Sequence, residues 1–329
     1  MKIALRTFAF FATAFLLLSL AACQKNDRPK IGFLVKMPEQ AWFINEQRAA
    51  TEAGQKLGFD VIKIGVPDGE KVISAIDNLS AQGAEGFVIC TPDVRLGPAI
   101  VARARQNDMK VITVDDQLVD ADGKPLEGVP HLGMSGYKIG MQVGDTLVAE
   151  MKKRGWNPDE VRALRITSNE LPTARERVRG ATDVLLKSGL REDQIFDAPQ
   201  RTTDTEGGFN AASPILAQHA DAKYWLIYAL NEESVLGGVR ATEQLHIPSE
   251  NVIGVGINGA NEAFAEFSKD RPTGFFATVA VSSTLHGRQT AEMLYHWIKD
   301  GVAPPPLTET TGTVMYRDNW QQVKQQLGL

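Results

Sequence analysis

The chain has 329 residues, of which 43% are hydrophobic and 23% are charged, and its formal net charge is −5. This length predicts about two domains at roughly 150 residues each, and the composition is typical of a folded globular protein. A mildly acidic chain with no basic block is a poor partner for nucleic acid, and two cysteines give no disulfide framework.

The N-terminus has the organisation of a secretory signal peptide. Lys2 and Arg6 are followed by an apolar stretch from Thr7 to Leu20 and then by small residues. The stretch is shorter than the ~20 residues that a membrane-spanning helix needs. We therefore favour a signal peptide over residues 1–22 rather than an uncleaved membrane anchor, and expect the mature protein to act outside the cytoplasm.

A cysteine follows this segment directly. The sequence LAAC at residues 20–23 resembles a bacterial lipobox, which implies cleavage before Cys23 and lipidation of its thiol. The alternative is ordinary cleavage nearby, with Cys23 incidental. Residues 23–30 are polar and are interpreted as a tether. Lipidation of Cys23 would leave Cys90 as a lone thiol.

From Lys30 onwards, short apolar runs alternate with amphipathic stretches. The runs are continuous and rich in Val and Ile, as expected of strands buried on both faces of a parallel sheet. The predicted strands of the first half are Lys30–Lys36, Phe59–Ile64, Gly86–Cys90 and Lys110–Val114, and the predicted helices are Trp42–Leu57, Glu70–Gln82 and Leu96–Asn107.

The pattern restarts after a loop rich in Asp, Gly and Pro at Asp120–Pro130. The predicted strands of the second half are Arg162–Thr167, Gln194–Ala198, Lys223–Tyr228, Asn251–Ile257 and Gly274–Val281. The predicted helices are Tyr137–Arg154, Thr173–Ser188, Gly207–His219, Glu232–Gln244 and Ser282–Asp300, and the segment Thr308–Tyr316 closes the pattern.

Strand–helix alternation of this length indicates two α/β lobes, each a doubly wound parallel sheet built from right-handed βαβ units. We assign residues 31–134 and about 281–308 to the N-terminal lobe. Residues 135–280 and about 309–329 form the C-terminal lobe. A three-segment hinge is expected near Met134–Ser135, Ala280–Val281 and Leu307–Thr311. The cleft between the lobes is the natural ligand site.

Polar and aromatic side chains gather where the predicted strands end. They include one lysine, one arginine, carboxylates, amides and aromatic rings, a mixture that suits a neutral polyhydroxylated ligand because each hydroxyl both donates and accepts hydrogen bonds. An aromatic ring can cover the apolar face of a sugar. For each residue alone, a role as helix cap or turn former remains open. The group comprises Lys36, Gln40, Trp42, Phe43, Cys90, Asp115, Asp116, Thr173, Arg177, Asn231 and Asn258.

Other chemistry is less well supported. The segment GVGING at residues 254–259 matches a dinucleotide-binding fingerprint, but no carboxylate follows at the end of the next predicted strand. The adjacent Asp115 and Asp116 should face opposite ways, so they do not form a catalytic pair. Cys90 follows an apolar run and is expected to be a buried, inert thiol. The five histidines lack metal-ligand spacing, and no cofactor or metal is expected.

Several segments carry a family resemblance. They include GFLVK (32–36), FDVIKIGVPDGEK (59–71), GFVICTPD (86–93), MKVITVDDQ (109–117), ITSNELPTAR (166–175), SVLGGVRATE (234–243) and VIGVGINGA (252–260). Through them the chain resembles the arabinose-binding members of the periplasmic sugar-binding proteins, the substrate-binding components of ABC importers. The resemblance implies a type I periplasmic binding protein architecture and a monomer, not an enzyme. By this resemblance, the protein would deliver L-arabinose, and often D-galactose or D-fucose, to an inner-membrane permease.

The resemblance also implies roles for individual residues. Lys36 would donate to sugar oxygens, Asp116 would accept from the anomeric hydroxyl, and Arg177 would reach the ring oxygen. Asn231 and Asn258 would bind from the second lobe. The remaining implied contacts are an aromatic wall of Trp42 and Phe43, the Cys90 thiol, Met134 as a discriminator between arabinose and hexoses, and Asp115, Leu171 and Thr173.

Gln40 departs from the family, which has a glutamate there; an amide keeps the hydrogen-bonding ability but loses the charge, so the resemblance implies the class of sugar rather than one pentose. Two alternatives remain: a receptor for a different aldose, and a sensor that presents its bound sugar to a chemoreceptor. A sugar-acting oxidoreductase would need a complete cofactor fingerprint. A sugar-responsive transcription regulator would need an N-terminal helix-turn-helix in place of the export signal.

Overall fold

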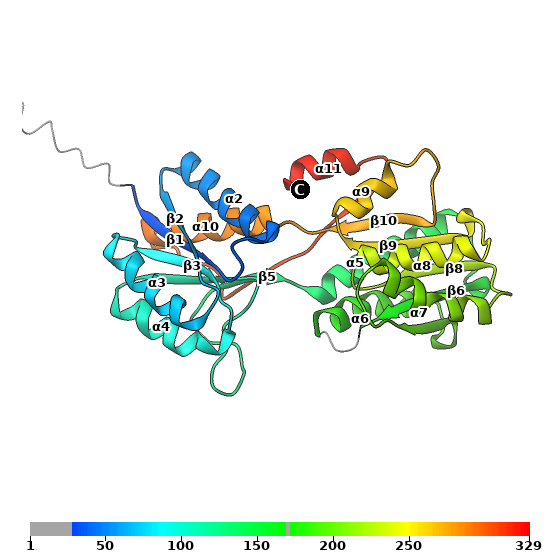
Figure 1. The fold of residues 1–329 in the computed structure, drawn as a ribbon, viewed down its shortest axis with the longest axis horizontal. Coiled ribbons are helices and arrows are strands. Elements are labelled where there is room, and N and C mark those ends of the chain that lie inside the picture. Colours follow the sequence, from blue (N-terminus) through cyan, green and yellow to red (C-terminus); the bar gives the residue numbers. More distant parts are fainter. Residues whose placement is uncertain (1–27, 169–171) are drawn as a thin grey trace, which may run out of the picture.

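The structure is a computed structural model that describes residues 28–168 and 172–329, with side chains of the second range described from Ala174 onwards. It consists of two α/β lobes, each built around a six-stranded sheet. Figure 1 shows the N-terminal lobe in blue and cyan and the C-terminal lobe in green and yellow. The predicted signal peptide, the predicted lipidation site Cys23 and Leu171 lie outside the described residues.

The N-terminal sheet is entirely parallel, with the strand order β11-β5-β4-β3-β1-β2. Alternate residues of its strands enter two different cores, so that Phe33 packs on one face and Leu34 on the other. This explains the unbroken apolar runs. Its strands are β1 (Lys30–Val35), β2 (Asp60–Gly65), β3 (Gly86–Cys90), β4 (Lys110–Val114), β5 (His131–Met134) and β11 (Leu307–Thr310), and its helices are α2 (Ala41–Leu57), α3 (Gly69–Ala81), α4 (Gly97–Gln106) and α10 (Ser283–Asp300).

The C-terminal sheet has the order β12-β10-β9-β8-β6-β7, and β12 is antiparallel to β10 while the other strands pair in parallel. Helices again cover both faces. The strands are β6 (Val161–Thr167), β7 (Ile195–Pro199), β8 (Tyr224–Tyr228), β9 (Val252–Asn258), β10 (Phe275–Ala280) and β12 (Thr313–Tyr316), and the helices are α5 (Gly136–Lys153), α6 (Pro172–Lys187), α7 (Thr205–Gln218), α8 (Glu232–Gln244), α9 (Asn261–Phe267) and α11 (Trp320–Leu327).

The predicted fold class is confirmed, and four elements differ from the sequence-based expectation, among them helix α9, which was not predicted. Strand β5 follows the loop directly and was not predicted. The closing segment Thr308–Tyr316 is not one element: it is divided between β11 in one sheet and β12 in the other, with Gly312 between them. Helix α11 was also not predicted. The local sequence pattern does not predict β5 and β11, because these short strands pair with each other across a long stretch of sequence.

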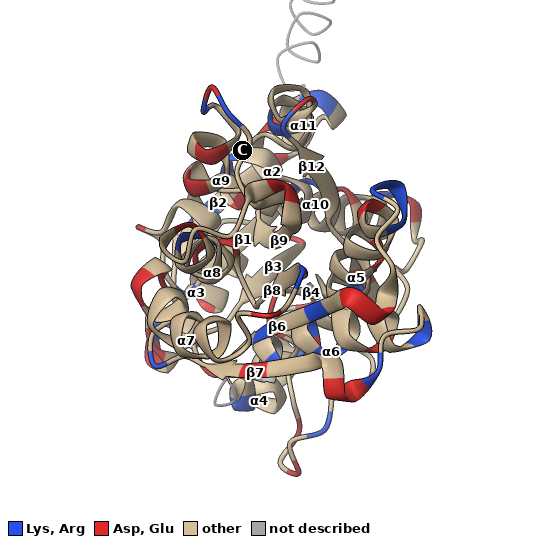
Figure 2. Ribbon diagram, turned by 90° about the vertical axis from the view of Figure 1, so that its right-hand side faces the viewer, with Lys and Arg blue, Asp and Glu red and all other residues tan. Residues whose placement is uncertain are grey.

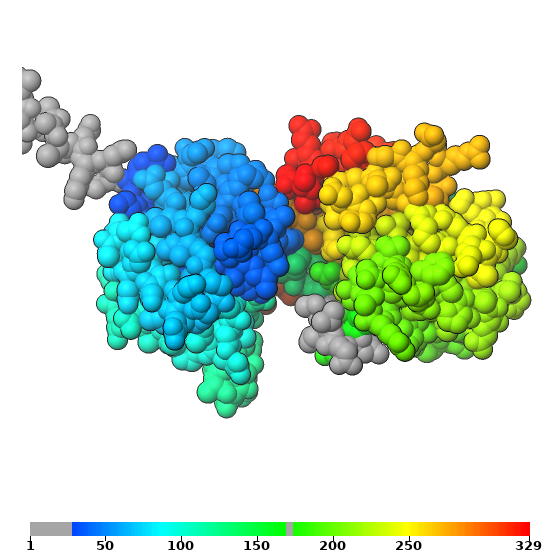
Figure 3. Space-filling model, in the orientation of Figure 1, coloured from blue at the N-terminus to red at the C-terminus, as the bar shows by residue number. Residues whose placement is uncertain are grey.

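Three segments connect the lobes. Strand β5 ends at Met134 and leads into α5, β10 ends at Ala280 and leads into α10, and β11 ends at Thr310 shortly before β12. The carboxyl ends of β5 and β10, and of the strands parallel to them, therefore point from each lobe toward the other. Figure 3 shows a deep groove between the lobes, so the structure is open.

Basic and acidic segments are interspersed around the periphery in Figure 2, and the strands at the centre are mostly uncharged. Within residues 28–168 and 172–329, the helices are too short or too polar to cross a membrane.

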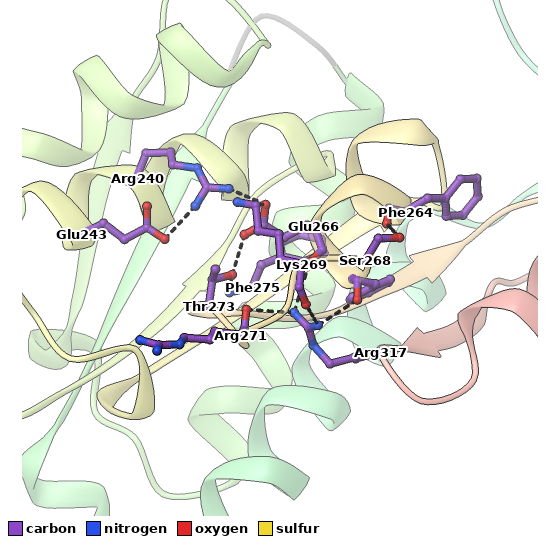
Figure 4. A network of polar contacts seen from close by, with 11 residues as sticks. Arg240, Glu243, Phe264, Glu266, Ser268, Lys269, Arg271, Thr273, Phe275 and Arg317 are labelled. Carbon is purple, nitrogen blue, oxygen red and sulfur yellow. Dashed lines mark hydrogen bonds and ion pairs between the residues drawn. The ribbon is translucent and has the colours of Figure 1, made fainter.

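One polar cluster secures the far end of the C-terminal lobe, as Figure 4 shows. The buried Glu266 accepts hydrogen bonds from Arg240 and Thr273 and pairs with Lys269. Arg317, which follows β12, donates to backbone carbonyls at the C-terminus of α9, including that of Phe267 at 2.8 Å. The cluster thus ties α9 to the last strand of the sheet.

Candidate functional site

Three side chains meet at the carboxyl ends of β1, β3 and β4 in the N-terminal lobe. Lys36 Nζ lies 2.5 Å from Asp116 Oδ2, and Cys90 Sγ lies 3.3 Å from the same oxygen. The side chains of Lys36 and Asp116 are 26% and 38% exposed, so both remain available to a ligand. Burial alone would lower the pKa of Lys36, but its hydrogen bond to Asp116 raises the pKa overall, and the ammonium stays charged.

The thiol of Cys90 is buried, as predicted. Burial, with the nearby charges of Asp116 and Asp115, raises its pKa far above the ordinary value. The thiol therefore stays protonated and unreactive, and serves as a weak hydrogen-bond donor to Asp116.

Asp115 and Asp116 face different ways, as predicted, but the predicted reason was wrong: both residues follow the end of β4 at Val114, so strand alternation does not apply to them. Asp115 has a φ of 62°, a left-handed conformation that is uncommon for a residue other than glycine. Its carboxylate accepts from Trp42 Nε1 and pairs with His286 Nδ1, both at 2.7 Å. Burial would raise the pKa of Asp115, but the hydrogen bond and charge of His286 lower it overall. Asp115 is thus engaged by the protein, while Asp116 faces Lys36.

The other predicted residues of this lobe surround the cluster. Gln40 is exposed immediately before α2, and Phe43 is buried with Lys36 Nζ 5.9 Å from its ring centre. Trp42 and Met134 are partly buried and pack against the core of the C-terminal lobe, which places both beside the hinge.

The C-terminal lobe supplies three predicted residues. Arg177 Nη1 donates to the carbonyl of Leu230 at 2.8 Å, while its Nε is buried without a hydrogen-bond partner among the described residues. Burial lowers the pKa of Arg177. Because an unpaired buried guanidinium nitrogen is costly, this site is suited to an additional acceptor.

Asn231 lies shortly after β8, and Asn258 is the last residue of the neighbouring strand β9. Asn231 caps α8 by accepting a hydrogen bond from Ser234 N, so the role as helix cap that the sequence left open is confirmed. Its side-chain amide also donates to the Thr203 carbonyl at 2.8 Å. Asn258 has a φ of 136°, a strained conformation of the kind often found at functional positions. The side chain of Thr173 lies outside the described residues.

Three buried polar residues near these strand ends were not singled out from the sequence. Glu46 lies one helical turn after Trp42, a spacing that places both on one face of α2 and could have revealed it. His286 is joined to Asp115 across 171 residues, so no local pattern shows it. Glu232 accepts from the backbone of Gly259 and Ala260 and holds the loop that follows Asn258.

Residues 28–317 match the family described as periplasmic binding proteins and sugar binding domain of LacI family. The chain belongs to this family. Among curated proteins, this family member is 64% identical to an ABC transporter L-arabinose-binding periplasmic protein of Azospirillum brasilense, over 95% of this chain and 94% of the other. It is 48% identical to the L-arabinose-binding periplasmic protein of Escherichia coli strain K12, over 97% and 98% of the two chains.

Solved structures support the same fold. A periplasmic ribose ABC transporter protein from Conexibacter woesei superposes with a TM-score of 0.72 at 20% identity, covering 91% of this periplasmic binding protein and 95% of the other chain. An arabinose binding protein from Geobacillus stearothermophilus superposes with a TM-score of 0.67 at 16% identity, covering 90% and 99%. At these identities the likeness establishes the two-lobed architecture alone.

Proposed function

We propose that this periplasmic binding protein binds L-arabinose between its two lobes and delivers it to an ABC importer without changing it chemically. The two curated relatives carry that sugar in their names and align with nearly the whole chain. They are named as binding proteins rather than enzymes. Related aldoses such as D-galactose and D-fucose are candidate second ligands.

The observation that carries this proposal is the division of polar groups between the lobes. Lys36 and Asp116 lie on one lobe, and Arg177, whose Nε has no hydrogen-bond partner among the described residues, lies on the other. Such a set supplies both donors and acceptors, as the hydroxyls of a neutral sugar require. In this proposal Asp116 accepts from the anomeric hydroxyl, Arg177 binds the ring oxygen, and Trp42 and Phe43 form an apolar wall.

Closure about the hinge is expected because the proposed sugar-binding side chains are divided between the two lobes. A sugar that contacts both lobes at once binds the closed form better, and so shifts the population from the open form toward it. In the closed groove, the charge of Asp116 is tolerable only if Lys36, Arg177 and the sugar hydroxyls satisfy it. An importer that distinguishes the two forms then receives only loaded protein.

The proposed setting is the periplasm. Residues 1–22 would direct export, and lipidation of Cys23 would anchor the mature monomer to the membrane beside its permease. Presentation of the loaded form to a chemoreceptor is compatible with the same site. Gln40 replaces the family's glutamate at the mouth of the site, and an amide keeps the hydrogen-bonding ability while losing the charge, so it is the position where sugar preference is expected to differ.

A thermal-shift screen of aldoses tests the proposal, because a ligand that binds only the folded form stabilises it by about 2.7 kcal/mol at a hundredfold excess over Kd. L-Arabinose should raise the melting temperature most, with D-galactose and D-fucose next and D-ribose as a comparison. A larger shift with an unrelated sugar, and none with L-arabinose, would contradict the proposal.

A further inference from the structure

A buried polar network lies directly beneath the Lys36–Asp116 pair, centred on Asp115. Both oxygens of Asp115 are occupied at 2.7 Å, one by Trp42 Nε1 and the other by His286 Nδ1. His286 is 1% exposed and belongs to the first turn of α10, immediately after a hinge segment. The network therefore joins α2, β4 and α10 at the base of the groove.

Glu46 completes the network from α2. It is fully buried, and neither of its carboxyl oxygens has a hydrogen-bond partner among the described residues. One of its oxygens, one of Asp115 and a ring nitrogen of His286 all lie within 4.8 Å of one another. Burial and the charge of Asp115 raise the pKa of Glu46 well above its ordinary value. As a neutral acid, Glu46 carries a proton beside Asp115, although no hydrogen bond joins the two among the described residues.

These three residues have the composition of a metal site, but their geometry favours a hydrogen-bond network. Two ligand atoms on a tetrahedral zinc ion lie about 3.3 Å apart, given bond lengths near 2.0 Å. The distance of 2.7 Å between His286 Nδ1 and Asp115 Oδ1 is that of a direct hydrogen bond between the two side chains. The other oxygen of Asp115 is already bonded to Trp42.

The second nitrogen of the His286 ring is also fixed. Nε2 lies 2.7 Å from the hydroxyl of Thr310, the last residue of β11 and the start of a hinge segment. The ring is thus held from both sides, and its Nδ1 is directed at Asp115. Asp115 in turn fixes Trp42, and its left-handed backbone turns the next residue, Asp116, toward Lys36.

We propose that Glu46 and His286 are positioning residues of the sugar site: they hold Asp115, and Asp115 orients Trp42 and the peptide that carries Asp116. This inference rests on the proposed function, because its consequence is measured as sugar affinity. Neither residue contacts the sugar.

Two substitutions of His286 distinguish the contribution of its Nδ1 contact with Asp115 from that of its Nε2 contact with Thr310. His286→Asn keeps an N–H group near the position of Nδ1 and loses the contact with Thr310. His286→Gln keeps an amide near Nε2 and loses the donor to Asp115. Calorimetric titration with L-arabinose should find His286→Asn close to the native affinity. His286→Gln and His286→Ala should bind at least ~10-fold more weakly, as expected for loss of a hydrogen bond to a charged group.

Controls make the result decisive. His296→Ala removes an exposed histidine that pairs with Asp300 on the same helix, and should bind like the native chain. Where His286 variants fail to fold, as judged by thermal melts without sugar, the Glu46 pair decides. Glu46→Gln keeps a neutral group with N–H donors beside Asp115 and should retain affinity, whereas Glu46→Leu removes the polar group and should lose at least ~10-fold.

The possible outcomes are distinguishable. Equal affinities of the Asn and Ala variants at His286, or native affinity in Glu46→Leu, would overturn the positioning role while native binding of L-arabinose keeps the proposed function intact. No binding by the native chain would refute the proposed function itself, and the positioning role with it.

Discussion

The side-chain directions of Asp115 and Asp116, which follow β4, depend on a single backbone angle. The φ of 62° at Asp115 turns its side chain into the lobe, where Trp42 and His286 bind it, while Asp116 stays half-exposed beside Lys36. One carboxylate thus becomes part of the scaffold and the other remains available to a ligand. Strained backbone of this kind persists where surrounding contacts determine it.

Two charged residues on different lobes, Asp116 and Arg177, are proposed to bind the sugar directly, and their substitution tests this. Asp116→Ala and Arg177→Ala should each weaken L-arabinose binding by about 2 kcal/mol or more, since each leaves a polar partner unpaired in the closed groove. Titration calorimetry measures both. Asp77→Ala, which removes a surface partner of Arg103, should leave affinity unchanged. Native affinity in both site variants would reject the assignment of the site.

The sequence was sufficient to predict the side chains at strand ends but not those beneath them. Lys36, Cys90 and Asp116 follow three apolar runs, and parallel pairing of those runs brings them within contact distance. Glu46 and His286 depend on how α2 and α10 pack against the sheet. That packing is a tertiary property, and neither the spacing of histidines nor the helical pattern expresses it.

At the scale of elements, the first residue of α8, Glu232, holds the loop that follows β9 by hydrogen bonds. Glu232 is fully buried and accepts from Gly259 N at 3.0 Å, Ala260 N at 2.8 Å and the Thr278 hydroxyl at 3.0 Å. Burial raises its pKa to about 7 in spite of these bonds. Its ionisation is therefore unfavourable in the folded chain compared with the unfolded one.

This predicts a pH-dependent stability. Between the ordinary value of 4.5 and about 7, the folded state holds a proton on Glu232 that the unfolded state has lost. Stability from this group should therefore fall as the pH rises through that window, by on the order of 3 kcal/mol, and stay constant above it. Urea unfolding at several pH values, compared with Glu232→Gln, isolates the effect. A difference between the two chains that does not vary with pH would contradict it.

The C-terminus of α9 offers a second test at this scale. Arg317 donates to the carbonyls of Phe267, Lys269, Glu266 and Arg271, where the helix leaves carbonyl groups unpaired. Arg317→Ala should lower the free energy of unfolding by roughly 1–3 kcal/mol. Arg317→Lys, which keeps the charge without the planar fork, should recover only part of the loss. Urea unfolding curves identical to that of the native chain would show that the cluster adds no stability.

Most strands and helices were predictable because each carries its own apolar period and ends at a glycine or polar turn. The exceptions are short or shared between lobes. Strand β5 has four residues and pairs with β11 from the far end of the sequence, and Gly312 divides the closing segment between two sheets. Local sequence does not specify which of two sheets a short strand joins.

At the scale of the molecule, three short segments connect the two lobes. The structure is open, with a groove between the lobes in Figure 3. Addition of L-arabinose should reduce the radius of gyration measured by small-angle X-ray scattering, because the sugar favours the closed form. Asp116→Ala at the same sugar concentration should show a smaller reduction. Saturation with sugar at constant radius of gyration would contradict the hinge mechanism.

The central claim is that one intact sugar is held by both lobes at once. A crystal structure grown with L-arabinose tests this most directly. The account predicts an unmodified monosaccharide between the lobes, in contact with Lys36 and Asp116 from one side and Arg177 from the other. A sugar bound elsewhere, or bound by one lobe with those side chains directed away from it, would contradict the claim.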